Sequence, residues 1–439
     1  MRQQLTKRIL FSVLLALFFL PFLQKQFSIF TFGPLAGEFI PTEKKELTLS
    51  GWFAGDYQTA YDKNYEENLG FRIPLIRLYN QVDFSFFNVA HGGDIVVGKQ
   101  GYLFQTQYLI AHAGKDFIGE KEIDARMERI KYVSKKLKEK NVTMIIAFAP
   151  SKADFYSEYV PPYYSNKNAA PTNYDFYRSK LQKSGVFFID FNDYFLELKE
   201  KSPYTLYPKQ GIHWSEYGMY LAADSLLKYI SEKTNLNLNN LFCDRIELSD
   251  ELRSTDYDLG DLSNVIFKMP HTAMPYPALR FEKNPDKVRP NVLVIGDSYY
   301  WNIYYSEIPK HIFNGANFWY YDHDVYADSL GGKGQVDLTT FMDEIKRQQV
   351  VLILETESNL TSIGFGFFEN AYDMLNGKGA ESPVAKYEAK IRNSPEWMEA
   401  IKKKAKDRNM TLDAQIRADA EWMVKEEREK AEQDTSGRK

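Results

Sequence analysis

The sequence predicts an α/β fold in which helices flank a parallel sheet, with a membrane-spanning segment before it and a helical extension after it. Short apolar runs recur along the chain, segments with helical periodicity lie between them, and the composition changes near both ends. Strands that alternate with helices are typical of a parallel sheet. With 439 residues, of which 44% are hydrophobic and 26% charged, the chain can hold one large globular domain with appendages.

The first 25 residues have the pattern of a targeting segment. Arg2, Lys7 and Arg8 precede an apolar run over residues 9–23. As a helix this run is about 22 Å long, a length that fits a signal-peptide core as well as a transmembrane anchor. No small-residue cleavage signal follows, so we predict an uncleaved single-pass anchor in the cytoplasmic membrane, with cleavage as the alternative. The basic residues should stay in the cytoplasm, which places the rest of the chain outside it.

Three further parts follow the anchor. Residues 26–60 are predicted to form an irregular linker, residues 61–375 the globular domain and residues 376–439 a helical C-terminal extension. Continuous apolar runs predict buried strands at 143–149, 186–189, 292–295, 318–321 and 350–354. Apolar spacing of three to four residues predicts helices over 123–140 and 217–230, and residues 94–104 should form a hairpin that turns at 99–101.

The C-terminal extension carries helix signals of its own. Ser394 and Pro395 have the pattern of an N-cap followed by the first helical residue. An apolar stripe further on consists of Leu412, Ile416, Ala420 and Met423. We expect this stripe to pack within the chain's own domain, and a partner protein is the alternative.

Ser298 is the strongest candidate for a nucleophile. The buried strand at 292–295 ends in Gly296, which permits a tight turn, and Ser298 stands where the next helix should begin. Open α/β sheets place their sites at this carboxyl edge, and amides at a helix start can hold an oxyanion. Asp297 or Ser298 acting only as a helix cap is the simpler alternative.

A serine hydroxyl needs a base, and His213 is the candidate. The chain has 6 histidines, and His213 lies in a loop just before a helix, beside Trp214. That position puts it on the same kind of sheet edge as Ser298. A structural histidine packed beside Trp214 is the competing interpretation.

Five motifs occur in the order typical of a known family. They are Asn68-Leu-Gly-Phe-Arg72, Gly98-Lys-Gln-Gly-Tyr-Leu-Phe104, Pro150-Ser-Lys152 with Tyr156, Gly211-Ile-His-Trp214 and Gly296-Asp-Ser298. Over residues 61–361 the sequence resembles the alginate-type O-acetyltransferases, whose SGNH hydrolase-like domain is permuted so that the histidine motif precedes the serine motif. The resemblance implies that Ser298 is the nucleophile and His213 the base. It also implies a multi-pass membrane O-acyltransferase partner that supplies acetyl groups.

The sequence departs from that family at one position of the site. The family usually has Asp two residues before the histidine, where this chain has Gly211. An acid there fixes the imidazole tautomer and stabilises the imidazolium. A carboxylate from elsewhere, a backbone carbonyl, or an inactive site are the alternatives. The candidate acids at predicted strand ends are Asp190, Asp193, Glu355 and Glu357.

The remaining site candidates concern the oxyanion and the substrate. Asn302 is a candidate oxyanion or substrate contact, and the aromatic residues Tyr299, Tyr300 and Trp301 are candidates for stacking on a sugar. No metal or cofactor is expected, since the acidic–histidine segment Tyr321–Asp324 reads as a solvated loop and the single Cys243 cannot form a cysteine cluster. The net charge of −4 argues against nucleic acid as a partner.

Three functions fit these residues. The first is transfer of acetyl groups to hydroxyls of an exported cell-envelope polysaccharide through a serine acyl-enzyme. The second is an esterase that uses the same residues with water as the acceptor. The third is a non-catalytic subunit that binds glycan or helps assemble an acetylation complex, an alternative that the missing Asp at position 211 keeps open. The family resemblance favours transfer.

Overall fold

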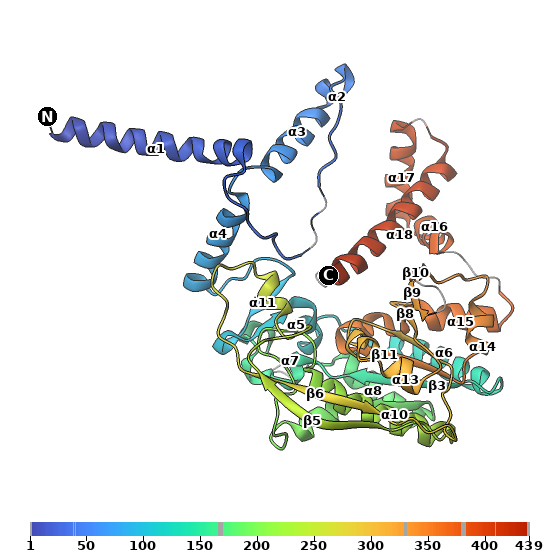
Figure 1. Ribbon diagram of the computed structural model, residues 1–439. Helices are drawn as coiled ribbons and strands as arrows, with labels where there is room; N and C mark the ends of the chain where they lie inside the picture. The colour runs from blue at the N-terminus through green and yellow to red at the C-terminus, as the bar shows by residue number, and fades with distance from the viewer. Residues whose placement is uncertain are drawn as a thin grey trace. The chain divides into compact units, whose positions relative to one another are not determined.

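The computed structural model describes residues 2–37, 39, 41–165, 170–328, 332–378, 383–408 and 410–436. The chain divides into two compact units (Figure 1). Unit 1 comprises residues 1–97, 259–270 and 436–439, and unit 2 comprises residues 98–258 and 271–435. The division therefore falls after Val97, whereas the sequence places the start of the globular domain at residue 61.

A seven-stranded sheet forms the centre of unit 2, in the order β10-β9-β8-β7-β11-β3-β4. The five strands from β8 to β4 are parallel, and β9 and β10 extend the sheet in antiparallel fashion. The strands are β3 (Thr143–Ala149), β4 (Phe187–Asp190), β7 (Val292–Gly296), β8 (Asn317–Tyr320), β9 (Asp324–Ala327), β10 (Gly332–Gln335) and β11 (Val350–Thr356). The predicted α/β class and all five predicted strands are confirmed. The sequence did not predict β9 and β10, which are short.

Helices cover both faces of this sheet. On one face, α6 and α8 pack with α14 and α15 around alternate residues of β3, β7 and β11. On the other face, α10 packs near β3 and β4. The unit 2 helices up to the end of this domain are α5 (Thr106–His112), α6 (Glu120–Lys138), α7 (Lys152–Phe155), α8 (Asn173–Ser184), α9 (Phe191–Leu198), α10 (Glu216–Thr234), α12 (Tyr300–Tyr305), α13 (Ile308–Ile312), α14 (Phe341–Lys346) and α15 (Phe367–Leu375).

The register of the central strands aligns their carboxyl ends. Gly296 of β7 pairs with Leu354 of β11, and Thr356 of β11 pairs with Ala149 of β3. The loops that follow these strands therefore meet at one edge of the sheet, the edge at which α/β sheets usually hold their sites.

Two hairpins accompany the main sheet. Strands β1 (Ile95–Val97) and β2 (Leu103–Gln105) form the predicted hairpin, with a 3-10 turn at Lys99–Gly101 between them. Strands β5 (Leu241–Ser249) and β6 (Met274–Phe281) form a longer antiparallel pair that the sequence did not predict. The segment between β5 and β6 contains α11 (Asp258–Leu262), and the first residue of this helix belongs to the site described below.

The C-terminal extension forms three helices with a core of their own. These are α16 (Pro383–Asn393), α17 (Pro395–Asp407) and α18 (Leu412–Ser436). Ile416 and Ala420 of α18 are fully buried against residues of α16 and α17, with Leu412 and Met423 packed beside them. Ser394 accepts a hydrogen bond from the Trp397 amide, as expected of an N-cap. The predicted stripe is thus used within the chain.

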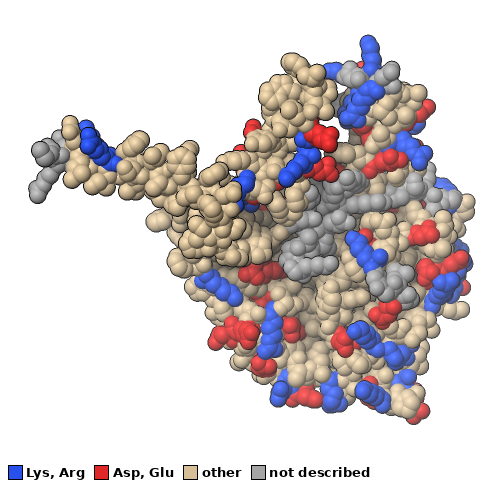
Figure 2. All heavy atoms as spheres, turned by 45° about the horizontal axis from the view of Figure 1, so that its top comes forward, with Lys and Arg blue, Asp and Glu red and all other residues tan. Residues whose placement is uncertain are grey.

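Unit 1 begins with α1 (Arg2–Phe27), which is long and apolar enough over residues 4–27 to cross a membrane. Figure 2 shows basic side chains near the N-terminal end of this helix and uncharged ones along most of its length, whereas positive and negative charges are interspersed over the larger unit. Helices α2 (Leu49–Ala54), α3 (Asp56–Glu67) and α4 (Arg72–Phe87) follow. Residues 26–60, predicted to be an irregular linker, therefore contain α2 and the first turn of α3.

Candidate active site

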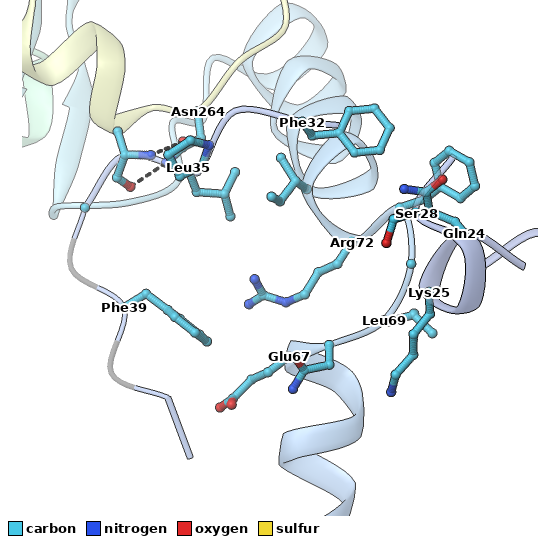
Figure 3. Close-up of a pocket in the computed structure, with 17 residues that line it drawn as sticks. Gln24, Lys25, Ser28, Phe32, Leu35, Phe39, Glu67, Leu69, Arg72 and Asn264 are labelled. Carbon is cyan, nitrogen blue, oxygen red and sulfur yellow. Dashed lines mark hydrogen bonds between the residues drawn. The ribbon is translucent and has the colours of Figure 1, made fainter. Parts of the chain in front are cut away.

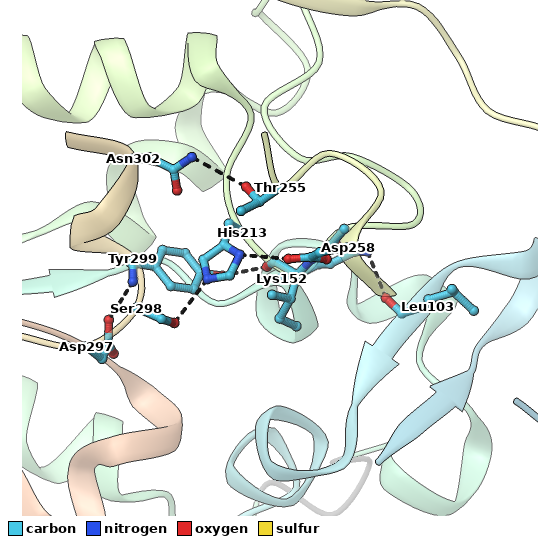
Figure 4. A network of polar contacts seen from close by, with 11 residues as sticks. Leu103, Lys152, His213, Thr255, Asp258, Asp297, Ser298, Tyr299 and Asn302 are labelled. Carbon is cyan, nitrogen blue, oxygen red and sulfur yellow. Dashed lines mark hydrogen bonds and ion pairs between the residues drawn. The ribbon is translucent and has the colours of Figure 1, made fainter. Parts of the chain in front are cut away.

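The nucleophile turn joins β7 to α12. A Cβ atom on Gly296 would lie 2.7 Å from the Leu354 carbonyl oxygen, so the close pairing of β7 with β11 requires glycine there. Ser298 follows two residues later, at the carboxyl edge of the sheet, and its side chain is 7% exposed. Its Oγ lies 3.0 Å from Nε2 of His213 (Figure 4). The two residues that the sequence singled out are thus brought together although 85 positions separate them.

The His213 side chain is fully buried in the loop before α10. Ser215 caps α10 by accepting a hydrogen bond from the Gly218 amide, which fixes the point where this loop ends. The other ring nitrogen, Nδ1, lies 3.0 Å from Oδ2 of Asp258. The second oxygen of Asp258 accepts a 3.0 Å hydrogen bond from the Ile212 amide. Asp258 thereby orients both the ring and the backbone that carries it.

Together these three side chains have the geometry of a Ser–His–Asp triad. A carboxylate at Nδ1 holds the proton on that nitrogen, which leaves Nε2 able to accept the serine proton. Both heavy-atom distances lie within the range in which proton transfer is feasible. The site is therefore arranged for nucleophilic acyl transfer.

Comparison with known proteins identifies the family of this chain. Residues 95–338, more than half of the chain, match the family described as "SGNH hydrolase-like domain, acetyltransferase AlgX". The chain belongs to this family.

Two curated relatives are named as alginate O-acetylases. The chain is 26% identical over 203 residues to "Probable alginate O-acetylase AlgJ" of Pseudomonas putida, covering 45% of this chain and 48% of that protein. The Pseudomonas aeruginosa protein of the same name is 24% identical over 187 residues, covering 42% and 44%. The chain thus spans about half the length of the curated relatives it matches.

Two solved structures show a distant likeness. The O-acetyltransferase domain of Pseudomonas putida AlgJ matches with a TM-score of 0.40 and 16% identity, covering 65% of this chain and 100% of that domain. Bacillus cereus PatB1 matches with a TM-score of 0.40 and 14% identity, covering 62% and 99%.

Asp258 makes the contact with His213 that was expected of an acid at position 211, and none of the four candidate acids makes that contact. Each of them is engaged elsewhere because it lies at another strand end or faces another helix. Asp190 accepts hydrogen bonds from Tyr174 Oη at 2.8 Å and from Arg178 Nε at 3.0 Å, and Asp193 pairs with the same arginine. Glu355 accepts a hydrogen bond from the Gly364 amide at 3.2 Å. Glu357 interacts with Asp154 and Ser151. Burial also raises the pKa values of Glu355 and Glu357 well above their usual range, which favours their neutral forms.

Gly211 is glycine because the acid-bearing segment occupies the space beside it. A Cβ atom at position 211 would lie 2.3 Å from the Thr255 carbonyl oxygen and 2.7 Å from Cγ of Pro208. The segment with Thr255 leads directly to Asp258. A side chain at 211 and the carboxylate of Asp258 therefore exclude one another in this arrangement.

Gly211→Asp should accordingly lower turnover and stability instead of restoring a missing acid. The new side chain has to displace the backbone at Thr255, which pulls Asp258 away from His213 and costs about 1–3 kcal/mol of strain. Acetyl-ester turnover and thermal unfolding measure both effects, and Gly211→Ala should already show much of the loss because it introduces the same Cβ. Higher turnover in Gly211→Asp would mean that Asp258 does not serve as the acid.

Lys152 stabilises the loop that carries His213 through hydrogen bonds to its backbone. Its ammonium is fully buried and donates to the carbonyl oxygens of Leu103, Lys209 and Gly211 at 2.7, 2.9 and 2.6 Å. Burial lowers the pKa of Lys152 to about 7, and the carboxylate of Asp258 opposes that shift. Three carbonyl acceptors satisfy all three N–H donors of an ammonium, so the contacts favour the charged form. In the sequence this lysine was visible only as part of a family motif.

Tyr299 connects the nucleophile turn to the histidine loop. Its hydroxyl donates a 2.7 Å hydrogen bond to the carbonyl of Ile212, and its ring packs against the imidazole of His213. The side chain is fully buried. Tyr299 is thus a positioning residue, and the prediction that it stacks on a sugar is wrong.

The other residues predicted to contact substrate lie as follows. Tyr300 and Trp301 are 2% and 8% exposed and pack on Phe318, so they belong mainly to the core. Asn302 lies on α12 with its amide 3.4 Å from Oγ1 of Thr255, close to the acid-bearing segment. The backbone amides of Tyr299, Tyr300 and Trp301 all donate hydrogen bonds to acceptors within the turn, namely Asp297 and the Ser298 carbonyl.

Asp297 holds the nucleophile turn against the end of β11. Its carboxylate accepts hydrogen bonds from the amides of Tyr299 and Thr356, the Thr356 hydroxyl and the Asn359 side chain at 2.7–3.0 Å. Burial raises the pKa of Asp297, and these donors counteract the shift. Such a carboxylate stabilises the turn and does not face His213. Across the described residues, no group of three or more His, Cys, Asp or Glu side chains is arranged to hold a metal.

Proposed function

We propose that this chain is an O-acetyltransferase that moves acetyl groups to hydroxyls of an exported cell-envelope polysaccharide through an acyl-enzyme on Ser298. The contact that carries the proposal is the linear series Ser298 Oγ, His213 Nε2, His213 Nδ1 and Asp258 Oδ2, with both hydrogen bonds at 3.0 Å. Membership of the acetyltransferase family and the names of the relatives support the choice of an acetyl group and a polysaccharide acceptor.

The reaction runs in two balanced halves. His213 takes the proton of Ser298 as Oγ attacks the acetyl carbonyl of the donor, and it returns that proton to the donor's leaving oxygen when the acyl-enzyme forms. An acceptor hydroxyl then gives its proton to His213 and attacks the acetyl-serine. As the bond between the acetyl carbon and Oγ breaks, His213 returns the proton to Oγ, which releases the acetylated sugar and restores Ser298. In each half the carboxylate of Asp258 stabilises the transient imidazolium.

Two other functions use the same fold. An esterase differs only in that water attacks the acyl-enzyme. The missing acid at position 211 made a non-catalytic binding or assembly subunit plausible, and Asp258 beside Nδ1 of His213 weakens that reason.

An acceptor-dependent assay separates these functions. We expect the purified full chain to cleave a soluble acetyl ester and, when an oligosaccharide is added, to form O-acetylated sugar detectable by mass spectrometry. Acetate released at the same rate with every acceptor, without any acetylated sugar, would identify an esterase. A chain that turns over no acetyl ester but binds the oligosaccharide would be the assembly subunit.

We further propose that α1 anchors the chain in the cytoplasmic membrane, with unit 2 outside the cytoplasm, and that a multi-pass membrane O-acyltransferase supplies the acetyl groups. The length and apolar surface of α1 and the basic residues near its N-terminal end support this placement. A reporter fused after residue 60 should be active only if it is of the kind that requires export. Activity of a reporter that works only in the cytoplasm would reject the topology.

A further inference from the structure

A cavity of about 760 Å³ in unit 1 lies at the end of α1, outside the site described above (Figure 3). The end of α1 packs tightly here, because a Cβ atom on Gly70 would lie 2.0 Å from the Pro21 carbonyl oxygen and 2.8 Å from the Lys25 amide nitrogen. Gly70 belongs to the Asn68–Arg72 motif, which the proposed reaction does not use. The motif thus packs directly against the C-terminal end of α1.

Two cations line this cavity and lack a fixed anionic partner. The guanidinium of Arg72 extends into it and lies 5.5 Å from the centre of the Phe39 ring, and the ammonium of Lys25 lies 4.8 Å from the centre of the Tyr65 ring. Neither side chain makes a hydrogen bond or ion pair with any residue that the structure describes. The positive end of the α4 dipole opens on the same cavity, since Arg72 and Ile73 begin that helix and line the space.

Among the described lining residues, Glu67 is the one carboxylate. It accepts hydrogen bonds from the Thr42 amide at 2.9 Å and the Thr42 hydroxyl at 2.5 Å, which lower its pKa, and the positive charges of Arg72 and Lys63 lower it further. Glu67 therefore offsets one of the two positive charges of Arg72 and Lys25, and the described lining keeps a net positive charge.

Part of the wall around these charges is apolar, and so is a neighbouring surface. Phe32, Leu35 and Leu69 line the cavity beside the cations. Helix α4, which starts at the cavity, exposes an apolar stripe along its length, consisting of Leu75, Leu78, Val82 and Phe86 at 41–77% exposure. Charged atoms surrounded by apolar walls, next to a helix with an exposed apolar face, match an amphiphile whose anionic head meets its hydrocarbon at the membrane surface.

We propose that this cavity binds the phosphate of an anionic phospholipid headgroup in the outer leaflet, with Arg72 as the main contact. A guanidinium binds phosphate through two parallel hydrogen bonds, and Lys25 adds a point charge from the end of α1. The site would fix the depth and orientation of the anchor in the bilayer. It depends on α1 lying in a membrane and is independent of the chemistry at Ser298.

The test uses the full chain in nonionic detergent micelles. Phosphatidylglycerol should raise the thermal unfolding midpoint and bind saturably, and phosphatidylcholine should do so much less. Arg72→Gln should weaken phosphatidylglycerol binding by about fivefold, the contribution of one cation near a lipid surface. Lys44→Gln, which removes an exposed cation outside the cavity lining, should change binding by less than about twofold.

Other outcomes overturn the proposal. Equal binding of the two lipids, or unchanged binding in Arg72→Gln, would show that the cavity is not a headgroup site. Inorganic phosphate that binds as tightly as phosphatidylglycerol would identify a site for free phosphate. If Arg72→Gln does not fold in lipid-free detergent, Arg72→Lys decides, because it keeps the charge but loses the two-pronged contact, and unchanged lipid affinity in that variant would reject the site.

Discussion

Ser298→Ala should abolish acetyl-ester turnover while the protein remains folded. The substitution removes the atom that forms the acyl-enzyme, a loss that reaches about 10⁶-fold in kcat when the nucleophile of a serine protease is removed. The fold should survive because the change removes one hydroxyl and one hydrogen bond, worth about 1 kcal/mol. Steady-state turnover and thermal unfolding of the purified variant measure the two effects.

A control at the other end of α12 and a mass measurement sharpen this test. Ser306→Ala removes a hydroxyl that donates to the Ile303 carbonyl and accepts from the Ile308 amide, away from His213, so its turnover should match the wild type. Wild-type protein quenched early in the reaction should carry one acetyl group on the peptide containing Ser298. Wild-type turnover in Ser298→Ala, or an acetyl group on another residue, would assign Ser298 to the helix cap.

Asp258→Asn should lower kcat by up to about 10⁴-fold, the loss caused by the same exchange at the acid of a serine protease. The asparagine amide can donate to Nδ1, which leaves the ring proton on Nε2 and prevents the imidazole from accepting the serine proton. Its carbonyl oxygen can still accept from the Ile212 amide, so the loop should keep its shape. Turnover across a pH series and circular dichroism together separate the tautomer effect from unfolding.

Asp→Asn substitutions at two other positions test whether the loss of turnover is specific to Asp258. Asp250→Asn changes an exposed carboxylate in the same segment, and Asp193→Asn changes one of the acids first considered, which pairs with Arg178. Both should retain turnover within about tenfold, since neither contacts the histidine. Should Asp193→Asn lose as much activity as Asp258→Asn, the assignment of the acid would be wrong.

The central sheet was predictable because its signals are local. Each of the five parallel strands is a short apolar run, and the buried stripe of α6 follows helical spacing with Ile123, Met127 and Ile130. Strands β5 and β6 lack such a signal, since their side chains alternate irregularly between buried and exposed positions. The linker prediction failed over α2 and α3 because their aromatic residues are largely exposed and show no buried stripe.

Two of the three residues of the candidate triad were predictable for a related reason. Ser298 and His213 each lie at the start of a helix after a recognisable element, so position along the chain indicated position on the sheet edge. Asp258 lies 45 residues after the histidine in an irregular segment between two unpredicted strands, and no periodic pattern links it to the sheet. The candidate acids were chosen because they lie at the ends of predicted strands. That criterion cannot identify Asp258, which lies in the segment between β5 and β6. Tyr299 and Lys152 were equally hidden, because their roles depend on carbonyl groups that carry no sequence signature.

The mutual exclusion of a side chain at position 211 and the acid at position 258 constrains how this site can have evolved. An ancestor with Asp at 211 could not gain the present arrangement by one substitution, because the 255–258 segment needs the room that only glycine leaves. A lineage passing between the two arrangements has to cross an intermediate with either a displaced loop or no acid. Changes at the two positions should therefore be inherited together across relatives, and a chain that lacks both acids is expected to have lost its catalytic role.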